Sequence, residues 1–134
     1  MSSTDLWIHM VWVTHDRFEY FDKRLLSSVC WHLKQRAMFQ AIQLDYAYGY
    51  KDHLHLLIRM QGKQSCSWIA NQLKGEISRW INKNEMTTDY FKWRKGYYAA
   101  SVSRSIIPKV RSYIKNQWDK HEQLSLEEEL QVLF

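Results

Sequence analysis

Apolar residues follow two different spacings along the chain, and the spacing changes from segment to segment. Runs of apolar, β-branched and aromatic residues, or their recurrence at every second position, predict strands, whereas recurrence every three to four positions predicts an amphipathic helix. In chain order the pattern predicts a strand over 6–14, a helix over 24–38, strands over 39–50 and 53–60, a helix over 65–84 and a strand over 91–102.

Two further helices are predicted after the last strand. Pro108 suits the first turn of a helix, which then continues through Ile114 to about Glu122. Ser125 is followed three residues later by Glu128, which resembles a capping box and predicts a short last helix.

The predicted order of elements, β-α-β-β-α-β followed by helices, is that of the ferredoxin-like split βαβ arrangement. We therefore expect an α+β fold with an antiparallel sheet, two helices on one face of the sheet, and the first and third strands at its centre. No repeat or linker interrupts the 134 residues, so a single domain over 1–134 is expected.

The chain is basic, with 19 Lys and Arg against 14 Asp and Glu and a formal net charge of +5. Acidic residues gather toward the C-terminus, where Glu127 to Glu129 are consecutive. The excess of positive charge therefore lies over the body of the chain, and a basic body favours a polyanionic partner.

Several classes of protein are excluded by what the sequence lacks. No apolar run approaches the ~18 residues of a membrane span, and the N-terminus does not have the pattern of a signal peptide. Cys30 and Cys66 match no metal-binding spacing, which indicates a reducing, cytoplasmic compartment. No glycine-rich phosphate loop occurs, so no nucleoside triphosphate is expected as a partner.

The clearest candidate chemistry is the pair His53 and His55. Side chains alternate along a strand, so both imidazoles point to the same face of the sheet. Two neutral imidazoles on one face can bind a single divalent cation. On this motif alone, the alternative that both are ordinary core or surface histidines stays open. The histidines without a comparable pairing are interpreted as structural: His9, His15, His32 and His121.

A second candidate pair lies on the helix that follows Pro108. Tyr113 and Gln117 are four residues apart, so the phenol and the amide share one helix face. On spacing alone, a packed tyrosine and a solvent-facing glutamine are an equally ordinary interpretation. If that helix lies against the histidine-bearing face of the sheet, Gln117 adds an oxygen to the two imidazole nitrogens. Such a mixed set, completed by water, suits Mg²⁺ or Mn²⁺ better than a closed zinc site, although zinc or cobalt binding in vitro stays open.

Five segments in order carry a resemblance to a known family. After the opening strand they are D-H-L-H-L-L-I at 52–58, L-K-G-E-I-S-R-W at 73–80, G-Y-Y-A-A-S-V at 96–102 and V-R-S-Y-I-K-N-Q at 110–117. Over nearly its whole length the chain resembles the single-tyrosine HUH transposases of the TnpA type, from the IS-two-hundred/six-hundred-five group of insertion sequences. Ser112 departs from the family pattern, where a larger residue is common. Residues 129–134 resemble a protease-site remnant, in which case the natural end is missing.

The resemblance implies a transposase that cleaves and rejoins single-stranded DNA at the hairpin-marked ends of an insertion sequence. The hydroxyl of Tyr113 would attack a phosphodiester, leaving a 5′-phosphotyrosine and a free 3′-OH, and a second strand end would then rejoin the DNA without ATP. Mg²⁺ or Mn²⁺ held by His53, His55 and Gln117 would assist this step. The resemblance also implies a homodimer with a flexible segment at 104–108, and it leaves open whether the tyrosine helix acts in cis or in trans.

Basic and aromatic residues near the second helix and the last strand are candidates for holding the DNA. Basic side chains neutralise phosphates, and aromatic rings stack on unpaired bases. The expected DNA contacts are Lys74, Arg79, Lys83, Arg94, Lys95 and Arg104.

Three residues next to these motifs have two interpretations each. Tyr97 and Tyr98 rival Tyr113 as nucleophiles, but no metal-type residue lies beside them, so packing or base stacking is favoured. Asp52 precedes His53 and either orients its imidazole or is a simple turn residue, and the turn is favoured.

Two other functions fit part of the sequence. A replication or conjugation nickase uses the same chemistry but usually carries additional domains, for which this chain has no room. A domesticated or non-catalytic module of the same fold would bind single-stranded nucleic acid, but it leaves the histidine pair and the Tyr113–Gln117 pair unexplained.

Overall fold

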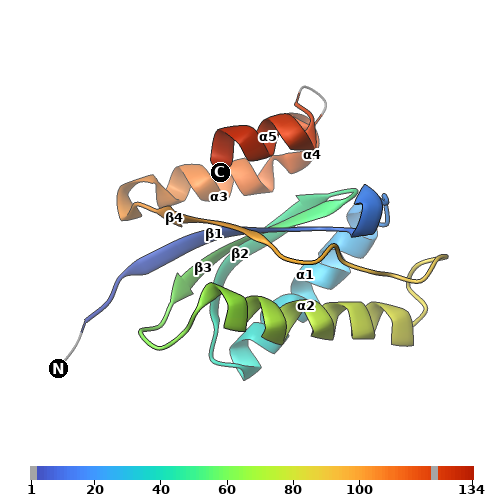
Figure 1. The fold of residues 1–134 in the computed structure, drawn as a ribbon, viewed down its shortest axis with the longest axis horizontal. Coiled ribbons are helices and arrows are strands. Elements are labelled where there is room, and N and C mark those ends of the chain that lie inside the picture. The colour runs from blue at the N-terminus through green and yellow to red at the C-terminus, as the bar shows by residue number, and fades with distance from the viewer. Residues whose placement is uncertain (1–2, 122–123) are drawn as a thin grey trace.

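A four-stranded antiparallel sheet lies between two layers of helices (Figure 1). The computed structural model describes residues 3–121 and 124–134. The main elements in chain order are β1 (Leu6–Val13), α1 (Lys23–Phe39), β2 (Gln43–Tyr50), β3 (His53–Met60), α2 (Cys66–Lys83), β4 (Tyr98–Val102), α3 (Ile107–Lys115), α4 (Gln117–Lys120) and α5 (Leu126–Leu133). Helices α1 and α2 cover one face of the sheet, and α3, α4 and α5 lie over the other.

The order of the strands in the sheet is β2-β3-β1-β4. This confirms the predicted ferredoxin-like topology, in which the first and third strands are central. The register of β1 against β3 pairs Val11 with His55 and Val13 with His53. Both histidines therefore lie in the interior of the sheet, away from its edges.

The two faces of β3 have different partners. Leu54, Leu56 and Ile58 are fully buried in the main hydrophobic core, which α1 and α2 complete. Because side chains alternate along a strand, His53 and His55 point to the opposite face, toward the C-terminal helices. A shift of β3 by one residue would exchange the two faces, so burial of the leucines also fixes the orientation of the histidines.

The β2–β3 hairpin requires a glycine at position 49. A Cβ atom on Gly49 would lie 2.2 Å from the carbonyl oxygen of His53. The backbones of β2 and β3 therefore approach each other closely beside the turn at residues 51–52. Asp52 lies in this turn, next to the start of β3.

Two predicted strands are shorter in the structure than the apolar pattern suggested. The segment 39–50 starts with the end of α1, and Ala41, at φ 56°, turns the chain before β2 begins. In the segment 91–102, only β4 is a strand, because Gly96, at φ 84°, interrupts the extended backbone. Positive φ does not fit a pleated ladder, and apolar spacing alone does not reveal it.

The predicted helix after the last strand is divided into two. Pro108 lies in the first turn of α3 as expected, but α3 ends at Lys115 and Asn116 separates it from α4. The predicted end at Glu122 lies outside the described residues. Among the described residues, no helix has both the length and the apolar character needed to cross a membrane.

Helix α5 closes the histidine-bearing side of the sheet. The Ser125 hydroxyl accepts a hydrogen bond from the Glu128 backbone N–H, which confirms the predicted cap. Leu126 is buried with Val11 and Val13 of β1, and Leu130 packs against the same cluster. The apolar stripe of α5 therefore docks on the central strand next to the histidines.

Candidate metal and tyrosine site

His53 and His55 are completely buried on β3, beneath the C-terminal helices. The Nδ1 atom of His53 lies 2.7 Å from Oδ1 of Asp52 and donates a hydrogen bond to it. Arg17 in turn donates from Nε to the other oxygen of Asp52 at 3.4 Å. Asp52 thus orients His53 so that Nε2 faces the interior of the site, and it is more than the simple turn residue that the sequence favours.

His55 is oriented by a second histidine. Its Nδ1 atom is 2.7 Å from Nε2 of His9, and the two rings stack with centroids 5.0 Å apart. His9 lies on β1 and is buried. In sequence His9 has no visible partner, since 46 residues separate it from His55, and only the pairing of β1 with β3 brings the rings together.

Gln117 and Tyr113 both reach this face of the sheet in the same chain. The Oε1 atom of Gln117 is 3.0 Å from Nε2 of His53, and Gln117 is fully buried. The Tyr113 ring makes an edge contact with His55, with centroids 6.1 Å apart. The four predicted residues therefore converge, and the tyrosine helix lies over the histidines of its own chain.

Packing and one ion pair hold α3 in this position. Ile107 and Ile114 are buried against Leu57 of β3, on the face of α3 that meets the sheet. Arg111 donates two hydrogen bonds, of 2.6 and 2.8 Å, to the carboxylate of Asp45 on β2. Arg111 belongs to the motif that contains Tyr113, so this part of the motif positions the helix.

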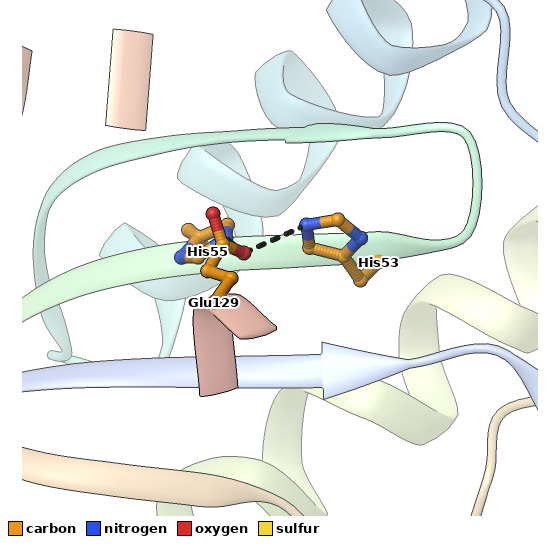
Figure 2. Close-up of side chains that lie close together, drawn as sticks. All are labelled: His53, His55 and Glu129. Atoms are coloured by element: carbon orange, nitrogen blue, oxygen red, sulfur yellow. Dashed lines mark hydrogen bonds and ion pairs between the residues drawn. The ribbon is translucent and has the colours of Figure 1, made fainter. Parts of the chain in front are cut away.

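Glu129 is the central residue of the site, and our sequence analysis missed it. It comes from α5 and is fully buried. Its Oε1 atom lies 3.0 Å from Nε2 of His55 and 3.3 Å from Nε2 of His53 (Figure 2). Its Oε2 atom accepts hydrogen bonds from the Tyr113 hydroxyl and, at 3.2 Å, from Nε2 of Gln117.

The sequence contained a signal for Glu129. Ser125 caps a helix whose buried stripe runs through Leu126 and Leu130, and the spacing puts Glu129 on that apolar face. The two preceding glutamates, Glu127 and Glu128, are exposed. An acid on the apolar stripe of a capped helix is a candidate ligand, whereas a run of three acids suggests only a solvated tail.

His121 completes the lining of the site. Its Nε2 atom is 3.3 Å from Oε2 of Glu129, and its ring stacks on Tyr50 with centroids 4.7 Å apart. The sequence had suggested no partner for this histidine. It lies just after α4, and its ring meets the ring of His53 edge-on, with centroids 4.6 Å apart.

The charges in the site are strongly coupled. Burial opposes protonation of His53, but the carboxylates of Asp52 and Glu129 outweigh this effect and raise its pKa to about 9. Burial lowers the pKa of His55 to about 4 and that of His9 to about 3. Burial also raises the pKa of Tyr113, and the neighbouring Glu129 carboxylate raises it further.

The Glu129 carboxylate stays ionised despite its burial. Loss of water contact favours its neutral form, but the imidazoles of His121, His53 and His55, all within 3.3 Å of its oxygens, hold its pKa well below the usual range. The site therefore contains a buried carboxylate whose charge is compensated by the surrounding imidazoles.

The donor set fits a divalent metal ion. One ligand atom from each of His53, His55 and Glu129 lies within 4.8 Å of the others. Oε1 of Glu129 is 3.0 and 3.3 Å from the two Nε2 atoms, and two ligands of one ion lie at such separations when the metal–ligand bonds are about 2.0–2.2 Å. Asp52 and His9 occupy the Nδ1 atoms of the two histidines, which leaves both Nε2 atoms for the ion. The amide oxygen of Gln117 adds a further oxygen donor.

The predicted DNA contacts do not gather at this site. The Lys74 ammonium donates to the carbonyl oxygens of Arg94 and Gly96, at 2.9 and 2.7 Å, and so holds the loop before β4. Arg79 pairs with Glu76, and Arg104 lies 3.3 Å from Asp5.

The remaining basic candidates stay close to solvent. Lys83 is exposed at the end of α2. Arg94 and Lys95 line a hollow of about 260 Å³ together with Tyr97 and Tyr98. Tyr98 packs on the cluster that α5 covers, and neither tyrosine takes part in the hydrogen bonds of the histidine site described above.

Comparisons with known proteins give a family from the sequence and related folds among solved structures. The family profile described as "Transposase IS200 like" matches residues 2–117. No protein with a curated functional description matches the chain. A crystal structure from Deinococcus radiodurans R1, provisionally assigned as a transposase, is similar with a TM-score of 0.68 and 20% identity, over 87% of this chain and 93% of that one. A REP-associated tyrosine transposase bound to a REP hairpin is similar with a TM-score of 0.60 and 13% identity, over 90% of this chain and 74% of that one.

At these identities the two structures establish a shared fold. The profile match is stronger evidence, since it spans every motif segment from the opening strand to Gln117. By sequence and by fold, the chain belongs to the IS200-like transposase family.

Proposed function

We propose that this DNA transposase cleaves and rejoins single-stranded DNA at hairpin-marked ends of an insertion sequence, with Tyr113 as its nucleophile. The observation that carries the proposal is the meeting of Tyr113 with the histidine pair. The Tyr113 hydroxyl donates to the same Glu129 carboxylate that contacts Nε2 of His53 and of His55.

The reaction is a transesterification. The phenol oxygen of Tyr113 gives up its proton and bonds to the scissile phosphorus, the bond from phosphorus to the 3′ oxygen breaks, and that oxygen leaves as a 3′-OH by taking up one proton in exchange for the one that the phenol lost. The 5′ end stays attached through a phosphotyrosine. A second 3′-OH then attacks this phosphorus, the bond to the Tyr113 oxygen breaks, and the phenol regains its proton as the strands are rejoined. Because each step exchanges one phosphoester bond for another, no nucleoside triphosphate is needed.

His53, His55 and Gln117 would hold Mg²⁺ or Mn²⁺, since nitrogen and oxygen donors together suit these ions. When bound, such an ion polarises the scissile phosphate and stabilises the charge that develops on its oxygens. Asp52 and His9 keep the imidazoles oriented, and burial excludes water from the site.

Single-stranded hairpin DNA is proposed as the substrate on two grounds. The chain is basic, with a formal net charge of +5, and basic surfaces bind phosphate backbones. The REP-associated relative was solved bound to a REP hairpin, which supports the same class of ligand here.

We further propose that the protein acts as a homodimer, an inference from the family. The described chain has its tyrosine helix over its own histidines, so a trans arrangement requires residues 103–106 ahead of α3 to swing. Light scattering coupled to gel filtration measures this directly, and a mass of one chain in solution would contradict the dimer.

The central test is a Tyr113→Phe variant with a labelled single-stranded element end and Mn²⁺. This change removes only the hydroxyl, so we expect the denaturant-resistant protein–DNA adduct to disappear while DNA binding persists. Tyr97→Phe and Tyr98→Phe serve as controls that keep the adduct. An adduct that survives in Tyr113→Phe would assign the nucleophile to another tyrosine.

The same experiment separates the transposase from a binding module of this fold. Full burial of His53, His55 and Gln117 is the observation that favours a non-catalytic module. Tight binding of the wild-type protein to the labelled strand, with no adduct in Mg²⁺ or Mn²⁺, would support the module.

A further inference from the structure

We propose that Glu129 is a fourth protein ligand of the divalent ion in the DNA-free protein, and that a phosphate oxygen of the DNA replaces it. This inference rests on the metal site proposed for His53, His55 and Gln117. It extends that site to α5, since Glu129 lies beyond residues 2–117, the part of the chain that the family profile matches.

The geometry of the carboxylate supports a ligand role. Oε1 of Glu129 points between the two imidazoles, 3.0 Å from Nε2 of His55 and 3.3 Å from Nε2 of His53 (Figure 2). These Nε2 atoms are the ones left free for metal, because each Nδ1 has its own partner in Asp52 or His9. An ion bound to both rings therefore meets Oε1 as its next neighbour.

The charge of the carboxylate supports the same role. A buried ionised carboxylate needs a compensating cation. The guanidinium of Arg17 pairs with Asp52 and Glu127. Without metal, the compensation comes from the imidazoles themselves. A divalent ion placed between the rings and Glu129 would balance the negative charge of the carboxylate in place of the imidazoles.

Packing delivers Glu129 to the site. The Ser125 cap starts α5, and Leu126 and Leu130 seat the helix on β1. Phe134 adds a ring contact to His9, with centroids 5.8 Å apart. Metal binding and docking of α5 should therefore support each other.

Because the site is buried beneath α5, DNA can reach the ion only if α5, and Glu129 with it, moves away. His53, His55, Gln117 and Glu129 all have 0% exposed surface. A phosphodiester cannot touch them while α5 is docked, so DNA reaches the ion only after α5 shifts. A phosphate oxygen, also an anionic oxygen donor, would then take the place of Oε1.

The test is calorimetric titration of Mn²⁺ into the full chain without DNA. We expect Glu129→Gln to weaken Mn²⁺ binding at least about tenfold, since changes even to groups behind the ligands cost that much. Glu128→Gln is the matched control, because Glu128 lies next in sequence and is exposed, and it should leave the affinity unchanged. Circular dichroism checks that each variant is folded.

Two further results make the outcome decisive. Hydrogen exchange over residues 126–133 of the wild-type protein should slow when Mn²⁺ is added, and this measurement does not depend on any variant. If His55→Ala loses Mn²⁺ binding while Glu129→Gln keeps it, and exchange in α5 does not change, Glu129 is no ligand although the proposed metal site stands. If the wild-type protein binds no Mn²⁺, the proposed metal site fails as well.

Discussion

At the scale of single residues, the orientation of His53 and His55 is set by the partner that each imidazole has at Nδ1. Asp52 accepts from His53 and His9 meets His55, both at 2.7 Å. These contacts fix the rings and leave both Nε2 atoms directed at Glu129. Neither contact involves a residue that binds substrate, yet both decide which nitrogen is available for a metal.

The buried histidines predict how stability of the metal-free protein depends on pH. The raised pKa of His53 contributes stability that is complete below pH about 6.5 and is lost as the pH rises through about 9. His9 and His55 have lowered pKa values, so the unfolded chain takes up protons before the folded one as the pH falls from about 6.5 to 4. Stability should therefore be greatest near pH 6.5.

Urea unfolding in EDTA at a series of pH values checks this prediction. Each proton taken up by only one state contributes a slope of about 1.4 kcal/mol per pH unit. A His9→Asn variant should flatten the acid side of the curve. A midpoint that rises steadily from pH 5 to pH 9 would contradict the assignment of a charged His53.

At the scale of elements, α2 holds the irregular segment that leads into β4. Asn82 donates from Nδ2 to the Phe91 carbonyl at 2.9 Å and accepts from the Phe91 N–H at 2.7 Å. Lys74 holds two carbonyl oxygens further along, those of Arg94 and Gly96. Side chains of one helix thus replace the ladder that this segment lacks, and β4 starts in register with β1.

A Lys74→Met variant tests this anchoring. Loss of two charge-assisted hydrogen bonds at a half-buried position should lower the free energy of unfolding by about 1–2 kcal/mol, as measured by urea unfolding. Lys83→Met, at an exposed position of the same helix, should change it by less than about 0.5 kcal/mol. Unchanged stability together with weaker binding of single-stranded DNA would instead make Lys74 a phosphate contact, as the sequence first suggested.

At the scale of the whole molecule, the three layers separate stability from function. The core between the sheet and the helices α1 and α2 holds most of the buried apolar side chains. The opposite layer is a thinner cover of α3, α4 and α5 over the polar groups of the site. Such a layer can shift without loss of the main core, which suits a site that must admit DNA.

This architecture predicts that duplex DNA is a poor substrate. A scissile phosphate must enter beneath α5 to reach the buried histidines, and a flexible single strand enters a narrow space more easily than a rigid duplex. Adduct formation with a single-stranded end should exceed that with the same sequence as a perfect duplex by at least about tenfold. Equal adduct yields from both substrates would show that the space beneath α5 opens widely enough to admit a duplex, and would contradict this prediction.

The order of the elements and the topology of the sheet were predictable from sequence, because alternating and helical apolar spacings reflect which faces are buried. The strand boundaries were less predictable, since they depend on the positive φ angles of Ala41 and Gly96. These angles are set by the turns that the chain makes in the folded structure. His53 and His55 were singled out by their spacing on one strand, whereas Tyr113 and Gln117 were singled out through the resemblance to a family motif; the roles of all four stay predictions.

The sequence by itself determined the features that depend on the spacing of nearby residues. These are the split βαβ order, the core face of β3, and the placement of His53 with His55 and of Tyr113 with Gln117 on common faces. Tertiary structure alone decided the partners of those pairs. His9 joins His55 through strand pairing across 46 residues, and Glu129 joins it across 74 through docking of α5. The physical reason is that a buried polar group takes whichever partner packing brings within hydrogen-bond distance, and packing between distant segments leaves no periodicity in the chain.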